Sequence, residues 1–126
     1  MSVDIVIEVE NKPGALAALA AVVEDAGVNL AAATFTGGDH KAELHILVPF
    51  AEPVRHALAV THGAVVMREH EVVVVEVEDT PGVLADLTRK IASAGVNLDT
   101  VYVATNNRVV FGSDDIDGLK KALGKG

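Results

Sequence analysis

The side chains that most often carry chemistry are scattered along this sequence rather than grouped. The chain has no cysteine and no His-x-His pattern, although His40 and His45 could share one hairpin. His56 and His62 are six residues apart on a predicted helix, a spacing that does not bring two side chains onto one face. Exposed polar side chains are therefore favoured over a metal site for all five histidines, the last of which is His70.

The carboxylates and serines show no catalytic pattern either. Glutamates alternate with valines at the ends of two predicted strands, and we interpret them as solvated rim residues. General acid–base chemistry would need a cleft around such a group. No serine lies in a nucleophile-elbow pattern, and no glycine-rich phosphate-binding motif occurs. We therefore expect no enzyme, no metal and no cofactor. The residues considered are Glu8, Glu10, Glu76, Glu78, Ser2, Ser93 and Ser113.

The composition excludes several classes of protein. Of the 126 residues, 50% are hydrophobic and only 3% are aromatic. This apolar fraction argues against disorder, and the apolar runs are too short to span a bilayer. The net charge of −8 argues against nucleic-acid binding, and the lack of cysteine excludes a disulfide scaffold. Because no basic region precedes an apolar run at the N-terminus, we expect a cytoplasmic protein without membrane or nucleic-acid partners.

One segment of the chain occurs twice. Residues 8–33 align with residues 76–101 without a gap, and half of the aligned positions are identical. The shared landmarks are a Pro-Gly step and the pentapeptide Ala-Gly-Val-Asn-Leu. Because such dense internal similarity indicates two copies of one structural unit, the predicted domains are residues 1–70 and 71–126.

Each copy predicts the same order of elements. Apolar and polar residues alternate before the Pro-Gly step, as in a half-buried strand, and proline suits the first turn of the helix that follows. Leucines give that helix one apolar stripe, and Gly27 and Gly95 can end it in a left-handed conformation. Ser113 is the expected N-cap of the last helix. The pattern predicts an α+β fold of two ferredoxin-like (βαββαβ) units with antiparallel sheets and helices on one face. The predicted strands are 3–9, 28–35, 41–48, 72–77, 96–104 and 108–111.

The final strand of the unit is not the same in the two copies. The second copy stops after its second helix, so its final strand is missing. A candidate strand at residues 64–68 runs directly into the strand at 72–77. It either completes the first copy, or turns back tightly at residues 69–71 to fill the vacancy in the second copy. In the third arrangement, a partner chain covers the open edge.

The Asn/Asp-x-Pro-Gly-x-Leu turn, the helix after it and the Ala-Gly-Val-Asn-Leu segment that closes it resemble the ACT domain family. The resemblance covers nearly the whole chain, twice, so the sequence looks like a tandem ACT protein. Members of that family are ligand-sensing modules of amino-acid-metabolism enzymes such as aspartokinases; they pair side by side and bind small amino acids at the seam. The resemblance therefore implies a non-enzymatic allosteric regulator with a small amino acid ligand, a homodimeric state and a metabolic enzyme as partner.

The resemblance also implies the site residues. It places a ligand loop at each Pro-Gly turn and a cross-interface asparagine at Asn29 and Asn97. Backbone N–H groups at a helix N-terminus favour a carboxylate, and Asp79 could accept hydrogen bonds from an ammonium group. Val9 and Val77 stand near the position where serine-binding members carry a histidine, so serine specificity is not supported. The implied loops comprise Asn11, Lys12, Pro13, Gly14, Ala15 and Leu16 in the first copy, and Asp79, Thr80, Pro81, Gly82, Val83 and Leu84 in the second.

Other interpretations of these residues stay open. The glycines can be ordinary helix caps, and the two asparagines can merely satisfy turns. The protein can also be a ligand-free assembly module that acts only through protein–protein contacts, or, as a third class, a small ferredoxin-like enzyme.

The first helix carries an unusual number of small apolar residues on its outer faces. A helix that is apolar nearly all round is usually buried on both sides, so we expect it to pack against a helix of the second copy or of a second chain. The alternative is that alanine is present for its helix propensity. The residues are Ala17, Ala18, Ala20, Ala21 and Val22.

Overall fold

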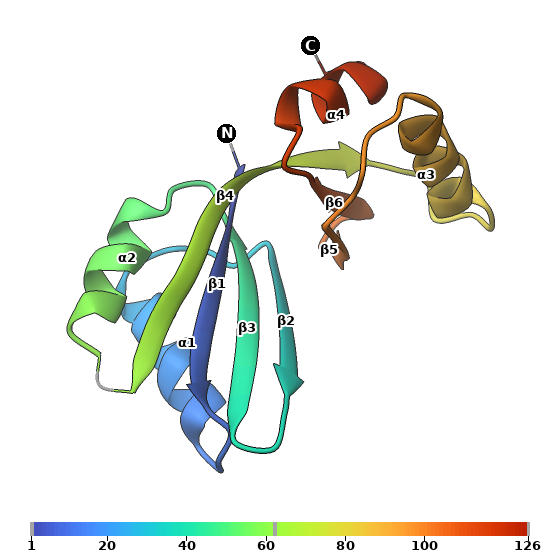
Figure 1. Cartoon of the computed structure of the whole chain (residues 1–126). Coiled ribbons are helices and arrows are strands. Elements are labelled where there is room, and N and C mark those ends of the chain that lie inside the picture. Colours follow the sequence, from blue (N-terminus) through green and yellow to red (C-terminus); the bar gives the residue numbers. More distant parts are fainter. Residues whose placement is uncertain (1, 62, 126) are drawn as a thin grey trace. The chain divides into compact units, whose positions relative to one another are not determined.

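Residues 2–61 and 63–125 are described by a computed structural model of the chain (Figure 1), which divides into the units Met1–His70 and Glu71–Gly126. Strands form where apolar residues alternate, and helices form where they recur every three or four positions. The α+β class with antiparallel strands is confirmed. None of the helices in these two stretches is long and apolar enough to cross a membrane.

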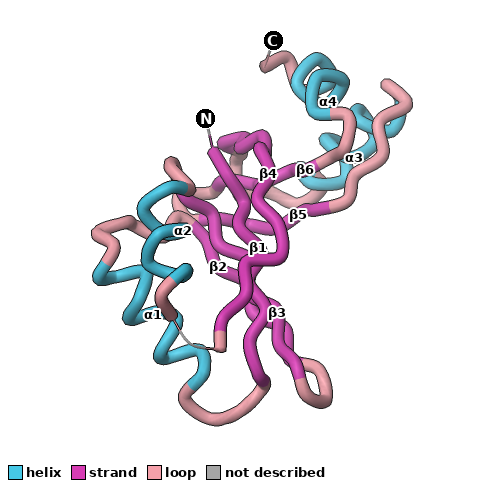
Figure 2. Tube along the Cα trace, turned by 60° about the vertical axis from the view of Figure 1, so that its left-hand side comes forward, coloured by secondary structure: helices cyan, strands magenta, loops and turns pink. Residues whose placement is uncertain are grey.

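Unit 1 is a sheet with two helices against it. Its elements are β1 (Ser2–Glu10), α1 (Ala15–Asp25), β2 (Ala32–Gly37), β3 (Lys41–Val48), α2 (Glu52–Ala59) and the first half of β4 (Ala64–Glu76). The strands lie in the order β2-β3-β1-β4, and β3 pairs antiparallel with both β1 and β2. Figure 2 shows α1 and α2 on the same side of these strands.

The alternation of apolar residues on β1 builds the core of unit 1. Every second residue of this strand packs against the helices, together with Leu19 and Val23 of α1. Leu16, which the apolar stripe also includes, is 41% exposed. The stripe is therefore predicted correctly for the middle of the helix and wrongly for its first turn. The buried residues of β1 on this face are Val3, Ile5, Ile7 and Val9.

Unit 2 is a smaller antiparallel sheet with two helices of its own. It contains the second half of β4, α3 (Val83–Ser93), β5 (Thr100–Ala104), β6 (Arg108–Gly112) and α4 (Ile116–Ala122). Its strands lie in the order β4-β6-β5. Both β4 and β5 pair antiparallel with β6, and Phe111 at the centre of β6 is fully buried. The core joins Phe111 to Ile91 of α3 and Leu119 of α4.

Strand β4 excludes one of the three arrangements of the candidate strand at residues 64–68. It is one continuous strand of 13 residues, so the tight turn at residues 69–71 that the second arrangement requires does not exist. Ala64 and Val66 pack against the core of unit 1, whereas Val73 to Glu76 pair with β6 in unit 2. The candidate strand therefore belongs to the first unit, and the chain passes into the second unit without reversing.

Strands β2 and β5 begin later than the apolar pattern predicts. Each starts four residues further on, because the segment after the helix packs apolar side chains on the core before its backbone joins the sheet. Val28 and Leu30 do so in unit 1, and Val96 and Leu98 do so in unit 2. The alternation in these segments therefore reflects core packing rather than strand pairing.

The C-terminal ends of α1 and α3 follow the sequence prediction, whereas the N-terminal end of α4 does not. Gly27 and Gly95 have φ angles of 71° and 75° directly after the helix C-caps, as predicted. The N-cap of α4 is not Ser113 but Asp115, whose carboxylate accepts a hydrogen bond from the N–H of Gly118 at 3.0 Å. The Ser113 hydroxyl instead donates to the carbonyl of Asn97 at 2.6 Å, which ties α4 to the segment before β5.

Candidate ligand site

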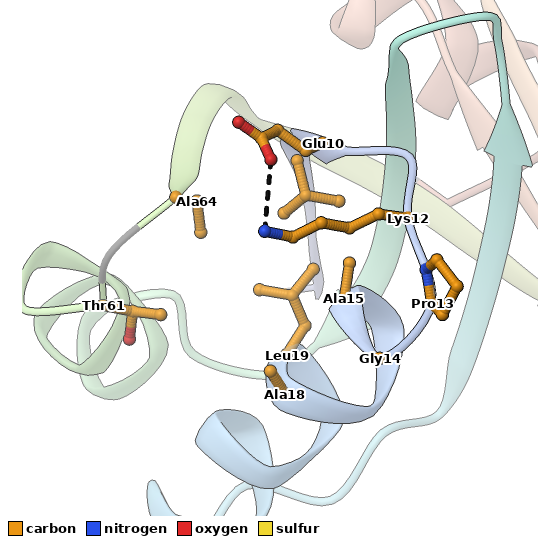
Figure 3. Close-up of a pocket in the computed structure, with 11 residues that line it drawn as sticks. Glu10, Lys12, Pro13, Gly14, Ala15, Ala18, Leu19, Thr61 and Ala64 are labelled. Carbon is orange, nitrogen blue, oxygen red and sulfur yellow. Dashed lines mark ion pairs between the residues drawn. The ribbon is translucent and has the colours of Figure 1, made fainter.

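A cavity of about 390 Å³ lies in unit 1 at the N-terminal end of α1. One wall is the turn from Lys12 to Ala15, and the opposite wall comes from Thr61, Gly63 and Ala64, which follow α2 and reach the first residue of β4 (Figure 3). This volume falls at the lower end of the roughly 300–1,000 Å³ that small-molecule sites occupy. The first Pro-Gly turn therefore faces a cavity large enough for a small ligand.

Backbone hydrogen bonds and one glycine hold the turn in shape. Gly14 has a φ of 87°, a left-handed conformation that glycine adopts without the steric cost of a Cβ. The N–H of Lys12 donates to the carbonyl of Glu10 at 3.1 Å, and the N–H of Ala15 donates to that of Lys12 at 3.2 Å. The chain thus folds back on itself between the end of β1 and the start of α1.

Lys12 and Glu10 place opposite charges at the mouth of the cavity. Figure 3 shows Lys12 extended across the cavity toward Glu10, with Nζ 3.2 Å from Oε2. The two side chains are 66% and 60% exposed, so water screens their attraction. An exposed pair of this kind separates easily when another charged group competes for its members.

The floor of the cavity is apolar. Val9 at the end of β1 and Leu19 on α1 are 5% and 2% exposed, and both belong to the core of unit 1. Ala15, Ala18 and Ala64 complete this surface with small side chains. The arrangement therefore offers charge at the mouth and aliphatic contact beneath it.

Two residues of the implied loop lie away from the cavity. The side chain of Asn11 donates from Nδ2 to the carbonyl of Gly38 at 2.6 Å, and its N–H donates to that of His40 at 2.9 Å. Asn11 is therefore bound to the turn of the hairpin between β2 and β3. Leu16 does not line the cavity either, so the loop contributes Lys12, Pro13, Gly14 and Ala15.

Unit 2 has a smaller cavity of about 160 Å³ at the second Pro-Gly turn. Its lining includes Asp79, Thr80, Val83 and Leu84 from the implied loop, but not Pro81 or Gly82. Glu78 adds a second carboxylate, and Arg108 lines the cavity with its guanidinium bound to Thr105. The two turns thus have the same backbone form, with φ of 91° at Gly82, but different surroundings.

The two implied cross-interface asparagines lie at the other end of the helices. Asn29 and Asn97 are exposed, and neither lines the cavity at the Pro-Gly turn of its own unit. Helix α1 has 11 residues and so spans about 16 Å. Within a single unit, the asparagine and the Pro-Gly turn are therefore not brought together.

Several site residues carry no signal that sequence reasoning could use. Glu10 alternates with valine at the end of a strand, and this pattern predicts only a solvated rim residue. Thr61 and Ala64 come from a distant part of the chain and fall in no motif. Only the folding of α2 and β4 against α1 brings them to the turn.

The histidines also depart from the sequence interpretation. His45 and His70 are half-buried, and both lie beside the fully buried carboxylate of Asp4, with ring nitrogens 3.0 and 2.9 Å from Oδ2. The other ring nitrogen of His45 is 2.9 Å from Glu43. The interpretation of these two histidines as exposed is therefore wrong, and His62 lies outside the described residues. Within the described ranges, no group of three or more His, Asp and Glu could hold a metal ion.

Comparison with solved structures finds this fold over almost the whole chain. Protein BT0572 from Bacteroides thetaiotaomicron has a TM-score of 0.85 and 25% identity, over 98% of this chain and 86% of that one. The ligand-free regulatory subunit of aspartate kinase from Thermus thermophilus has a TM-score of 0.68 and 19% identity, and its counterpart from Thermus flavus 0.65 and 18%. Both of these alignments cover 98% of this chain and 91% of the other. At identities of 19% and 18%, the similarity of this chain to the two Thermus proteins shows only a shared fold.

Comparisons of sequence match a smaller part of the chain than comparisons of structure do. The search among curated proteins gives no match. The model of the ACT domain family matches residues 72–124, which lie within unit 2 and include the second Pro-Gly turn, Ile91 and Phe111 of its core, and Asn97. Residues 72–124 of this chain are therefore similar in sequence to the ACT domain family.

Proposed function

We propose that this protein is a non-enzymatic regulatory module that binds a small amino acid and modulates a metabolic enzyme. The observation that carries the proposal is the cavity at the first Pro-Gly turn, with opposite charges at its mouth and an aliphatic floor. An amino acid zwitterion has the complementary pair of charges. Regulatory subunits of aspartate kinase share the fold, which supports an enzyme as the partner.

The proposal includes the architecture that the repeat implies. Both units are ACT-type, ferredoxin-like repeats, and two chains associate as a cytoplasmic homodimer. Asn29 and Asn97 then act on ligand loops of neighbouring units, since neither reaches the turn of its own unit. Support for association comes from α1, on which Ala17, Ala18 and Ala20 are exposed to solvent in the single chain. We predict that a helix of the second copy or of a second chain covers these alanines.

A second candidate function is assembly without a ligand. It is favoured by the ion pair between Lys12 and Glu10, because the charges at the cavity mouth already satisfy one another. In this case the exposed alanine face of α1 would bind protein, and the cavity would remain filled with water.

Thermal unfolding of the full chain against each of the twenty amino acids separates the two functions. A ligand at 100-fold over its Kd adds about 2.7 kcal/mol to the free energy of unfolding, which raises the Tm by several degrees. A selective shift that disappears in Lys12→Ala but persists in Lys90→Ala, an exposed lysine of α3, supports amino acid binding. Twenty unchanged traces would refute it and favour the assembly module.

A further inference from the structure

We propose that the cavity of unit 1 selects a small amino acid with an uncharged aliphatic side chain, and that the cavity of unit 2 does not bind it. The inference rests on the proposed function and names the class of ligand that its site accepts. Its basis is the charge and polarity of the lining residues of the two cavities.

The charges at the mouth of the unit 1 cavity define the head group. Among the described residues that line this cavity, only Glu10 and Lys12 are charged. Lys12 binds the carboxylate of the ligand, and Glu10 accepts hydrogen bonds from its ammonium group. Because the charges of these two residues cancel, a ligand with a single charge would leave either Lys12 or Glu10 without its partner.

The ion pair between these two residues opens at little cost. Nζ and Oε2 are 3.2 Å apart, and both side chains are more than half exposed. Exposed pairs contribute little to stability, since water already solvates both groups. The ligand therefore replaces one screened contact with two charge-assisted hydrogen bonds in a more enclosed place.

The floor of the cavity defines the side chain. Leu19 and Val9 present aliphatic surface, and Ala15, Ala18 and Ala64 leave room above it. The hydroxyl of Thr61 already donates to the carbonyl of Ala57 at 2.8 Å. A charged side chain on this floor would lose its hydration without gaining a partner, which is strongly unfavourable. An aliphatic side chain instead removes apolar surface from water.

The cavity of unit 2 lacks the features that this ligand needs. The residue that corresponds to Lys12 is Thr80, so no lysine faces Glu78. Arg108 donates from Nε and Nη2 to the carbonyl and hydroxyl of Thr105, both at 2.8 Å, so two of its five N–H donors are already used. The two carboxylates of Glu78 and Asp79 repel the carboxylate of an amino acid. The volume of about 160 Å³ is also well below that of the unit 1 cavity.

Calorimetric titration of the full chain tests the ligand class. The probes are L-alanine, L-valine and L-leucine, with L-aspartate and L-lysine as charged competitors. Isobutylamine and isovaleric acid serve as valine without its carboxylate and without its ammonium group. We expect one aliphatic amino acid to bind with one site per chain, and each single-charge mimic to bind at least about tenfold more weakly.

Variants assign the two charges to the two residues. Lys12→Gln should raise the Kd of the amino acid about tenfold but not that of isobutylamine, which has no carboxylate to lose and no longer competes with Lys12 for Glu10. Glu10→Gln should raise the Kd of the amino acid about as much but not that of isovaleric acid, which no longer competes with Glu10 for Lys12. The charge-matched controls Lys90→Gln and Glu24→Gln, on exposed helix positions outside both cavities, should bind like the unaltered protein. Circular dichroism of every variant verifies that it is folded.

The outcomes separate the inference from the function on which it rests. Tighter binding of aspartate or lysine, two sites per chain, or an unchanged Kd in Lys12→Gln would overturn the inference while leaving an amino acid sensor in place. If none of the twenty amino acids binds the unaltered protein, the proposed function fails and the inference fails with it.

Discussion

The glycine of the first Pro-Gly turn offers a direct test of the backbone geometry at the candidate site. Gly14 has a φ of 87°, and a Cβ placed on it would meet no heavy atom within 4 Å. Gly14→Ala therefore adds no clash and changes only the conformational energy. A left-handed L-residue costs roughly 1–2 kcal/mol. The loss of freedom in the unfolded chain offsets this by about 0.4–1 kcal/mol, so the net expectation is a destabilisation of about 1 kcal/mol.

The same atoms with the opposite chirality supply the control. D-alanine accepts a positive φ without strain, so a semisynthetic chain with D-alanine at position 14 keeps the gain from the unfolded state and becomes more stable by about 0.4–1 kcal/mol. The two diastereomers should therefore differ by about 1–2 kcal/mol.

Urea unfolding followed by circular dichroism measures this difference, and the extrapolation to water converts the midpoint to a free energy. Gly82, with a φ of 91° and equally open surroundings, repeats the test in the second unit. Equal stability of the L- and D-alanine proteins would show that the turn does not hold a left-handed residue. In that case the account of why glycine occupies both turns would be wrong.

Three further perturbations test the fold around the site. Leu19→Ala empties a position that is 2% exposed and should lower the free energy of unfolding by about 3–5 kcal/mol in a urea titration; a loss below about 1 kcal/mol would contradict its place in the core. Asp115→Ala should cost about 1 kcal/mol because it removes the N-cap of α4, and an unchanged unfolding midpoint would argue against that cap. Arg55 donates two hydrogen bonds of 2.7 Å to Glu69, and these lower the pKa of the Glu69 carboxyl from its ordinary 4.5. The folded chain then binds that proton less tightly than the unfolded chain, so the pair stabilises fully above pH 4.5 and loses this effect as the pH falls through the lowered value. Arg55→Gln should flatten this acid-side decline below pH 4.5, and an identical pH profile would exclude the pair as its source.

The parts of this protein that the sequence determined are those that depend on neighbouring residues. Strand β3 spans Lys41–Val48 as predicted, because alternation along one strand is a local property. The left-handed glycines that end α1 and α3 follow from the same kind of rule, since only the residue and its two dihedral angles are involved. The position of the first Pro-Gly turn is therefore predictable from the sequence.

The parts that tertiary structure decided depend on residues far apart in the chain. The family resemblance places Asn11 in the ligand loop. In the structure, its side chain instead donates to the carbonyl of Gly38 in the hairpin between β2 and β3. Asp4 stands between Val3 and Ile5 in an alternating strand, where a polar side chain ordinarily faces water, yet pairing with β3 and β4 places His45 and His70 beside it.

The candidate cavity shows the same division. Its charged mouth is encoded within three residues, from Glu10 to Lys12, and could be found by inspection of the sequence. Its opposite wall comes from Thr61 and Ala64, some fifty residues later, and no local pattern marks them. Spacing along the chain predicts which side chains share a helix or strand. Which elements face each other is decided by burying apolar surface from the whole chain at once, and that is a property of the fold.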